Sequence, residues 1–319
     1  MISVVIPNYN SAKYLAETVQ SVQAQTMPAW ELLIVDDGSK DTSLAIAEEL
    51  ARQDSRISVH AQANAGASSA RNHGLSKARP DFPYALCLDS DDLLLPGAFK
   101  TLLALLEAQP EAPAACGFLS DMDADGHPIE TNRFEPLISR RGVEGLRLVR
   151  RRPEAPLVFG DLCFRNHIIT PGQVLIRKIA LEKVGVFDTS LVYVEDYDLW
   201  WRLTMQAGPI PVTPQPVLRY RHHGASISRN KAAVKRGQTA WRQRLLSYPK
   251  MTPQQRHIGR VGYFYFCAVH WEQGVYFLRK GYIKLGLGLI YGGVRDLMLS
   301  ACDLLSLRRQ AQAAGKPVT

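Results

Sequence analysis

The segment YALCLDSDD, residues 84–92, runs from an apolar strand directly into three carboxylates. Residues 84–88 have the composition of a buried strand, and Asp89, Asp91 and Asp92 follow at once. Carboxylates placed against a buried strand are costly unless a partner neutralises them. Mg²⁺ and Mn²⁺ take oxygen ligands and usually bind together with substrate phosphates. The Asp-x-Asp spacing therefore predicts a divalent-cation site at the end of this strand.

Two earlier strands end in the same way. The apolar run 2–6 is followed by PNYN at 7–10, and the run 32–35 by DDGS at 36–39. Short apolar strands that alternate with helices are typical of an α/β fold whose mostly parallel sheet is covered on both faces. Ligands bind such sheets beyond the carboxyl ends of the strands, where these clusters fall. The expected strands are 2–6, 32–35, 57–60 and 84–88, with helices that begin after Ser11 and Asp41 as caps and a third over 67–78.

The middle of the chain is less regular. Residues 140–152 carry six arginines and are expected to form an exposed helix or loop. Residues 170–181 indicate a strand followed by a helix, and 195–205 a helix with an inward apolar face. Four prolines favour an extended segment over 209–221.

Charge is distributed unevenly along the 319 residues. Residues 1–120 hold 8 Lys/Arg and 14 Asp/Glu, whereas residues 221–319 hold 17 Lys/Arg and 3 Asp/Glu, a net charge of +14. An acidic first part suits a metal site, and a basic end suits an anionic surface.

The region after residue 230 is also aromatic, with 11 of the 27 Phe, Trp and Tyr residues between Trp241 and Tyr291. A spanning helix needs about 20 apolar residues, and no such run occurs, so we expect no transmembrane segment. Basic charge, aromatics and an amphipathic stripe favour a helix lying on a membrane. A helical domain packed on the core and a dimer interface are the alternatives. The stripe consists of Ile283, Leu287, Ile290, Val294, Met298 and Ala301.

The cysteine content favours a reducing compartment, because the five cysteines are an odd number without paired spacing. The first residues, MISVVIP, lack a positive segment and a long apolar segment, so they are expected to form a strand and not a signal peptide. Both features predict a cytoplasmic protein, and the basic tail places it at the inner face of the membrane.

Together these segments resemble the family 2 glycosyltransferases, which have the Rossmann-like GT-A fold. The resemblance covers residues 1–230 and implies a nucleotide-sugar-binding half at 1–120 and an acceptor and catalytic half at 121–230. The basic helical region 231–319 lies outside it. Besides the three strand ends, the matching segments are NAG at 64–66, ARN at 70–72, VGVFD at 184–188, EDYDLW at 195–200 and YRHH at 220–223.

The resemblance implies a donor site for a nucleotide-diphosphate sugar, expected to be a UDP-sugar, with Mn²⁺ or Mg²⁺. Asp37 would accept a hydrogen bond from a pyrimidine, with Asp36 as the alternative, and Arg221 would help to hold phosphate. The implied donor contacts are Pro7, Tyr9, Asp36, Asp37, Arg71, Asp89, Ser90 and Arg221. The implied metal ligands are Asp91, Asp89 and His223, with His222 as the alternative histidine.

The acid pair Glu195-Asp196 corresponds to the catalytic acids of the family. Inverting transfer needs one base to take the proton of the acceptor hydroxyl, and we expect Asp196 to be that base. Trp200 and Trp201 could stack on an acceptor sugar. The expected acceptor is a lipid-linked or cell-surface glycan precursor.

One departure from the family pattern concerns processivity. Processive polysaccharide synthases carry Gln-x-x-Arg-Trp, whereas this chain reads DLWWR at 198–202. Transfer of one sugar per encounter is therefore expected.

Two other classes of protein are weighed against this interpretation. A nucleotidyltransferase usually has a glycine-rich phosphate loop after its first strand, where this chain has PNYN. A nucleic-acid-binding protein could use the basic tail, but no known binding module is recognisable, so nucleic acid is not expected as a partner.

Overall fold

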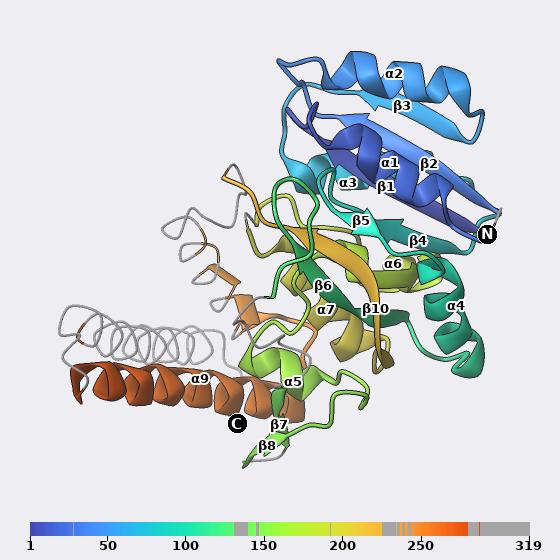
Figure 1. Ribbon diagram of the computed structural model, residues 1–319. Helices are drawn as coiled ribbons and strands as arrows, with labels where there is room; N and C mark the ends of the chain where they lie inside the picture. The colour runs from blue at the N-terminus through green and yellow to red at the C-terminus, as the bar shows by residue number, and fades with distance from the viewer. Residues whose placement is uncertain are drawn as a thin grey trace.

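The computed structural model describes residues 1–27, 29–130, 140–144, 147–191 and 193–224, and beyond them 234, 237, 240, 241, 244, 245, 247–279 and 287. A large sheet with helices on both faces forms the body of the described chain (Figure 1). The α/β architecture predicted from the alternating segments is confirmed.

The sheet has eight strands within the described residues, in the order β3-β2-β1-β4-β9-β6-β10-β5. β1, β2, β3 and β4 pair in parallel, and β10 is parallel to β6, whereas β9 and β5 are antiparallel to their neighbours. The sheet is therefore mostly parallel, as expected. Its strands are β1 Ile2–Asn8, β2 Trp30–Asp36, β3 Ile57–Ala61, β4 Tyr84–Cys87, β5 Leu93–Leu94, β6 Ala114–Met122, β9 Val174–Arg177 and β10 Val212–Arg221.

The helices follow the predicted segments closely. The expected cap Ser11 does not cap the first helix, because its hydroxyl contacts Ser90 at 2.6 Å. The helices are α1 Leu15–Gln23, α2 Ser43–Gln53, α3 Ala67–Lys77, α4 Ala98–Ala108, α5 Phe159–Phe164, α6 Lys178–Val184, α7 Glu195–Gln206 and α9 Pro253–Arg279, with a 3₁₀ turn at Pro171–Gln173.

Successive side chains of the buried strands point to opposite faces of the sheet, and the core is therefore divided into two parts. Ile2, Val4 and Ile6 of β1 pack with the apolar side of α1 on one face of the sheet. Val5 points to the other face and packs in the cluster that includes α7. Because successive strand residues face opposite sides, these continuous apolar runs bury both faces of the sheet.

The arginine-rich segment was predicted wrongly as an exposed helix or loop. It forms an antiparallel hairpin of β7 Arg141–Glu144 and β8 Arg147–Arg150, and the Arg140 side chain is fully buried. The physical reason is close packing on α5, since a Cβ placed on Gly142 would overlap Oδ1 of the buried Asp161. Only a chain without a side chain at this position can approach α5 so closely.

Trp241, from the chain after residue 230, packs on α7. Its ring stacks on Tyr197 of α7 with centroids 4.0 Å apart and meets Trp201 edge-on at 6.2 Å. No helix among the described residues is long and apolar enough to cross a membrane. The predicted stripe from Ile283 to Ala301 lies outside the described residues except for Leu287, which is exposed.

We expect Trp241→Ala to lower the free energy of unfolding by about 3–5 kcal/mol, because it empties a packed aromatic site. Trp271→Ala is the matched control, since Trp271 is 47% exposed, and it should change stability by less than about 0.5 kcal/mol. Chemical denaturation of the full chain measures both changes. Equal stability of the two variants would show that the Trp241 contact does not support the fold.

Candidate active site

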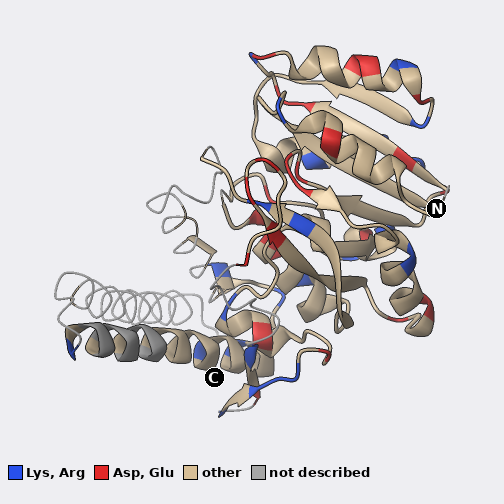
Figure 2. Cartoon of the chain, viewed as in Figure 1, with Lys and Arg blue, Asp and Glu red and all other residues tan. Residues whose placement is uncertain are grey.

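The polar clusters after β1, β2 and β4 meet at one edge of the sheet, as predicted, and Figure 2 shows acidic segments gathered there. Asn8 and Asp36 end neighbouring parallel strands, and Asn8 Nδ2 donates to Asp36 Oδ1 over 2.7 Å. Asp36 Oδ2 accepts the backbone N–H of Ser39 over 3.0 Å. Both Asn8 and Asp36 are buried, so Asp36 fixes the turn and does not face a ligand.

Asp37 organises the loop that follows β3. Its Oδ1 accepts hydrogen bonds from Gln62 Nε2 and the Ala65 N–H, and its Oδ2 accepts one from the Gly66 N–H, all at 2.8 Å. Nearby, the side chain of Tyr9 is 49% exposed, and Pro7 is partly exposed. These residues form an open platform beside an ordered loop, which is suitable for a base and a ribose.

Asp91 and His223 lie together although they are 132 positions apart. Asp91 Oδ2 is 2.6 Å from His223 Nε2, and the ring of Tyr14 packs against His223 with centroids 4.9 Å apart. Burial, and then the negative charge of Asp89, raise the pKa of Asp91, while His223 opposes this shift. This contact places a carboxylate and an imidazole, two ligand types for divalent cations, side by side.

The described residues contain no group of three or more His, Cys, Asp or Glu side chains arranged to hold a metal. Two protein ligands still fit Mg²⁺ or Mn²⁺, because these ions are commonly held by one or two side chains and by substrate phosphates. Asp89 is less suited, since its Oδ1 accepts from Arg71 at 2.7 Å and its Oδ2 from Thr170 at 3.1 Å.

Arg71 connects the aspartate cluster at 89–92 with α7. Its Nη2 donates to Asp89 and its Nη1 donates to Glu195 Oε1 over 2.9 Å. The Arg71 side chain is only 5% exposed. Arg71 therefore bridges two carboxylates and does not present its guanidinium to a nucleotide, which differs from the sequence expectation.

The two acids at the start of α7 have different surroundings. The Glu195 carboxylate is paired with Arg71, whereas within the described part of the chain the Asp196 carboxylate accepts a hydrogen bond only from the adjacent Tyr197 N–H. Burial, followed by the negative charge of Glu195, raises the pKa of Asp196 to about 8. A carboxylate with a pKa near neutral is suited to take a proton as a general base.

Ion pairs within α7 and from a distant segment hold this helix. Arg202 Nε donates over 2.6 Å to the fully buried Asp198, which lies one turn earlier in the same helix. Arg244 Nε, from the region after residue 230, is 2.9 Å from Asp198 and also pairs with Asp188. Sequence reasoning missed Arg244, because nothing in its local sequence distinguishes it from other arginines of the basic tail.

Arg221 and Ser90, which were expected at the donor, are engaged within the protein. The Arg221 side chain is buried, and its three guanidinium nitrogens donate to Glu17, the Asp91 carbonyl and the Ala124 carbonyl. The Ser90 hydroxyl contacts Ser11. Both residues therefore position the cluster at 89–92.

Thr170 is a further residue of the site that the sequence did not reveal. Its hydroxyl lies 3.1 Å from oxygens of both Asp89 and Asp92. The other carboxylate oxygen of Asp92, Oδ1, accepts the Arg221 N–H over 3.0 Å. Burial, and then the charges of Asp91 and Asp89, raise the pKa of Asp92 well above its usual value.

The expectation that Trp200 and Trp201 stack on an acceptor is wrong. Both are fully buried, and Trp201 contacts Phe159, Trp241 and Tyr248. Their position on the inward face of α7 explains this outcome, because the face that carries Leu199 and Leu203 is also buried.

Comparison with known proteins places these features in context. The family model described as glycosyl transferase family 2 matches residues 3–185. An uncharacterized glycosyltransferase of Rickettsia typhi is 26% identical over 287 residues, covering 89% of this chain and 82% of that protein.

Solved structures show the same fold. TarS of S. aureus in complex with UDP-GlcNAc aligns with a TM-score of 0.63 at 19% identity, covering 85% of this chain and 72% of that chain. A mannosyltransferase of Pyrobaculum calidifontis in complex with GDP-Man and Mn²⁺ aligns with a TM-score of 0.64 at 15% identity, covering 98% of this chain and 80% of that chain. The similarity extends to the GT-A arrangement of the sheet and its helices.

Proposed function

The chain belongs to glycosyl transferase family 2 and is a glycosyltransferase. From this premise we propose an inverting, metal-dependent reaction that uses a nucleotide-sugar donor, as bound by the structural neighbours. One sugar would pass from a nucleotide-diphosphate sugar, with UDP as the preferred nucleotide, to an acceptor hydroxyl. The observation that carries the proposal is the bridge Asp89–Arg71–Glu195. It joins the aspartate cluster that contains the proposed metal ligand Asp91 to the start of α7, where Asp196 lies.

The two halves of the site come from different parts of the sequence. Residues 1–120 supply the exposed Tyr9, the loop that the buried Asp37 holds, and the proposed ligand Asp91. Residues 121–230 supply Asp196 and His223. We assign donor binding to the first part and proton transfer to the second. Pro7 and Tyr9 would contact the base or ribose, as their exposure at the strand end allows.

Proton transfer is assigned to Asp196 because Glu195 is already paired with Arg71. The acceptor oxygen attacks the anomeric carbon as the bond to the diphosphate oxygen breaks, and Asp196 takes the hydroxyl proton. A single base and a direct displacement invert the anomeric centre. Asp91 and His223 would hold Mn²⁺ or Mg²⁺, whose charge stabilises the departing nucleotide diphosphate.

The acceptor is proposed to be a lipid-linked or cell-surface glycan precursor at the cytoplasmic face of the membrane. The net charge of +14 over residues 221–319 supports contact with an anionic surface. One sugar per encounter is proposed, because the chain has DLWWR in place of the motif of processive synthases.

Calorimetric titration with UDP, GDP and dTDP, each with and without Mn²⁺, tests the donor site. We expect one nucleotide to bind, with an affinity at least about tenfold higher in the presence of Mn²⁺. That result would identify the nucleotide of the donor sugar. If a folded protein bound none of the three in either condition, the proposed donor site would be refuted.

A further inference from the structure

The arginine hairpin, defined here as residues 140–152, divides its six arginines between two roles. Arg140 and Arg151 are anchors, since both pair with the fully buried Asp161 of α5, at 3.7 Å and 3.0 Å. Arg140 also donates to the backbone carbonyls of Arg152 and Ala155. These contacts fix the hairpin rigidly on the domain.

The other four arginines of the hairpin are exposed: Arg141, Arg147, Arg150 and Arg152. Arg141 and Arg150 are directly opposite each other in the antiparallel ladder. Like charges at opposite positions of a strand pair destabilise it. Among the described residues, no carboxylate is in ion-pair range of the side chains of Arg141, Arg147 or Arg150. An anionic partner from outside would remove this repulsion.

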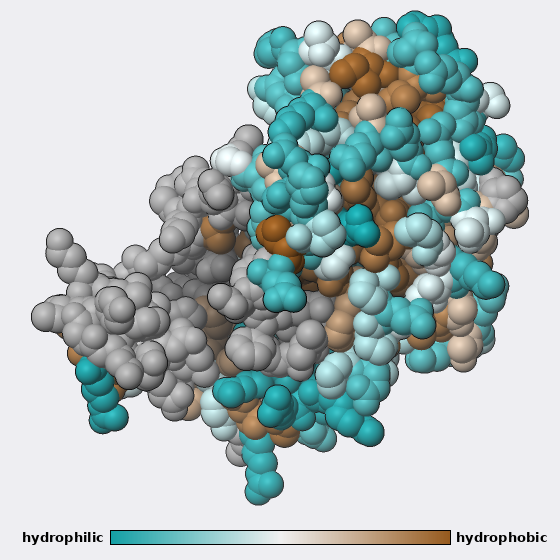
Figure 3. Space-filling view, viewed as in Figure 1, coloured by the Kyte–Doolittle hydropathy of each residue, from teal (hydrophilic) through white to brown (hydrophobic). Residues whose placement is uncertain are grey.

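The hairpin lies beside α9, which contacts both of its strands and α5. α9 exposes two aromatic side chains, Phe264 and Trp271, which are seven positions apart and therefore share a helix face. Exposed aromatics next to basic side chains are typical of surfaces that enter the interfacial layer of a bilayer. Figure 3 shows the hairpin as hydrophilic surface at the lower edge of the molecule with apolar surface beside it.

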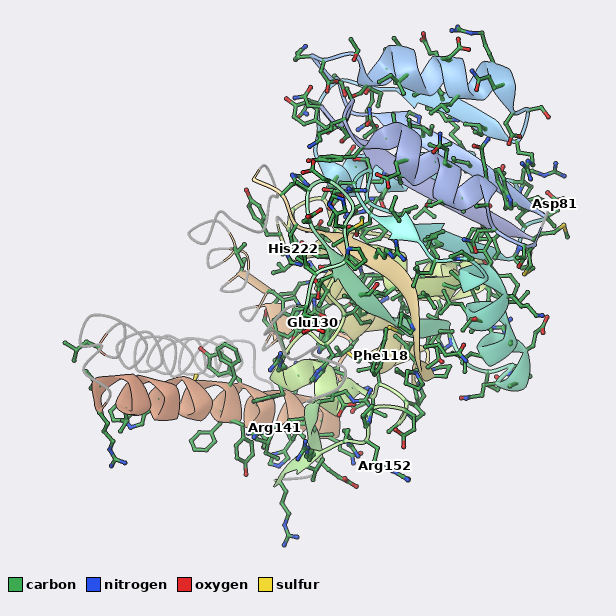
Figure 4. All side chains as sticks on the ribbon, viewed as in Figure 1. Asp81, Phe118, Glu130, Arg141, Arg152 and His222 are labelled. Carbon is green, nitrogen blue, oxygen red and sulfur yellow. The ribbon has the colours of Figure 1, made fainter. Side chains whose placement is uncertain are left out.

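We propose that the arginine hairpin, together with the exposed aromatic face of α9, docks the enzyme onto an anionic lipid bilayer. The proposal rests on the proposed function, because a lipid-linked acceptor must be reached at a membrane surface. Figure 4 places Arg141 and Arg152 at the lower edge of the view and His222, beside the active site, above them.

Cosedimentation of the full chain with lipid vesicles tests the proposal. Vesicles of phosphatidylcholine alone are compared with vesicles that also contain phosphatidylglycerol. Each basic side chain at an anionic surface strengthens binding by about fivefold, so Arg147→Glu with Arg150→Glu should weaken binding to the anionic vesicles by about 25-fold or more. Added salt should weaken binding of the wild type, because the attraction is electrostatic.

The matched control is Lys100→Glu with Lys183→Glu, which makes the same charge change at exposed lysines of α4 and α6. It should bind anionic vesicles nearly as well as the wild type. The proposal would be overturned if the hairpin variant bound anionic vesicles as well as the wild type does, or if the wild type bound both vesicle types equally. It would also be overturned if the wild type bound inorganic pyrophosphate tightly and the hairpin variant did not. In that case the hairpin would hold an acceptor phosphate.

Nucleotide titration of the same samples separates the two proposals. Loss of vesicle binding with intact Mn²⁺-dependent nucleotide binding is the result expected for the hairpin variant. Vesicle binding by a wild-type protein that binds no nucleotide would uphold docking while refuting the proposed function.

Discussion

Asp196→Asn is expected to lower kcat by about 10²–10⁴-fold, the usual contribution of a general base. The amide keeps the size of the side chain but cannot accept the proton of the acceptor hydroxyl. Binding of the donor nucleotide should be nearly unchanged, because within the described chain the Asp196 carboxylate bonds to the Tyr197 N–H of its own helix and not to the strand-end loops of the donor platform. Initial rates with a donor sugar and calorimetry of its nucleotide measure the two quantities.

Glu195→Gln is the matched control, since it changes the neighbouring acid of the same turn. The amide oxygen of the substituted side chain could still accept a hydrogen bond from Arg71, so the variant should keep much more activity than Asp196→Asn. Loss of activity confined to Glu195→Gln, with an active Asp196→Asn enzyme, would assign the base to Glu195 instead.

The pH dependence of kcat/KM provides an independent test of the base. The base acts in its ionised form, and burial raises the pKa of Asp196 to about 8. Activity should therefore fall as the pH drops below about 8 and reach a plateau above it. Glu195→Gln removes the neighbouring negative charge that raises this pKa, so its profile should shift to lower pH. A wild-type profile flat from pH 5 to 9 would contradict this assignment, because an ordinary carboxyl titrates near pH 4.

Asp91→Asn is expected to remove most of the metal-dependent part of nucleotide binding, an effect of about 10–100-fold. Asp91 would supply the carboxylate oxygen of the proposed two-residue cation site, and an amide is a poor substitute for its charge. The measurement is calorimetric titration of the preferred nucleotide with and without Mn²⁺. His223→Ala should have the same effect, because His223 Nε2 lies 2.6 Å from Asp91 Oδ2 and would be the second ligand of the same proposed site.

The chain contains a natural control for this experiment in the neighbouring pair Asp121 and His222, whose Oδ1 and Nε2 atoms are 2.5 Å apart. Asp121→Asn and His222→Ala should retain Mn²⁺-dependent binding. If they abolished it while Asp91→Asn and His223→Ala did not, the cation would belong to the Asp121 and His222 pair. This comparison also decides between the adjacent histidines.

The sequence by itself determined the fold and the edge of the sheet at which the residues of the proposed donor site gather. Continuous apolar strands such as Ile2–Asn8 and Trp30–Asp36 can be buried only in a sheet covered on both faces, and their polar ends must then meet. The spacing of Asp89 and Asp91 was visible for the same local reason, whereas the acid pair at 195–196 was implied by the family resemblance. The local sequence pattern is enough to predict a feature when a single strand or helix determines it.

Only the tertiary structure decided which charged groups face a ligand and which are used within the protein. The local sequence does not distinguish three arginines that the fold buries, Arg71, Arg221 and Arg140. Each of them pairs with a carboxylate from another part of the chain. Trp201 was likewise expected to stack on a sugar, but in the folded chain Trp241 packs against it. A charged or aromatic side chain takes its role from its neighbours, and contacts between residues distant in sequence form only when the sheet and helices assemble.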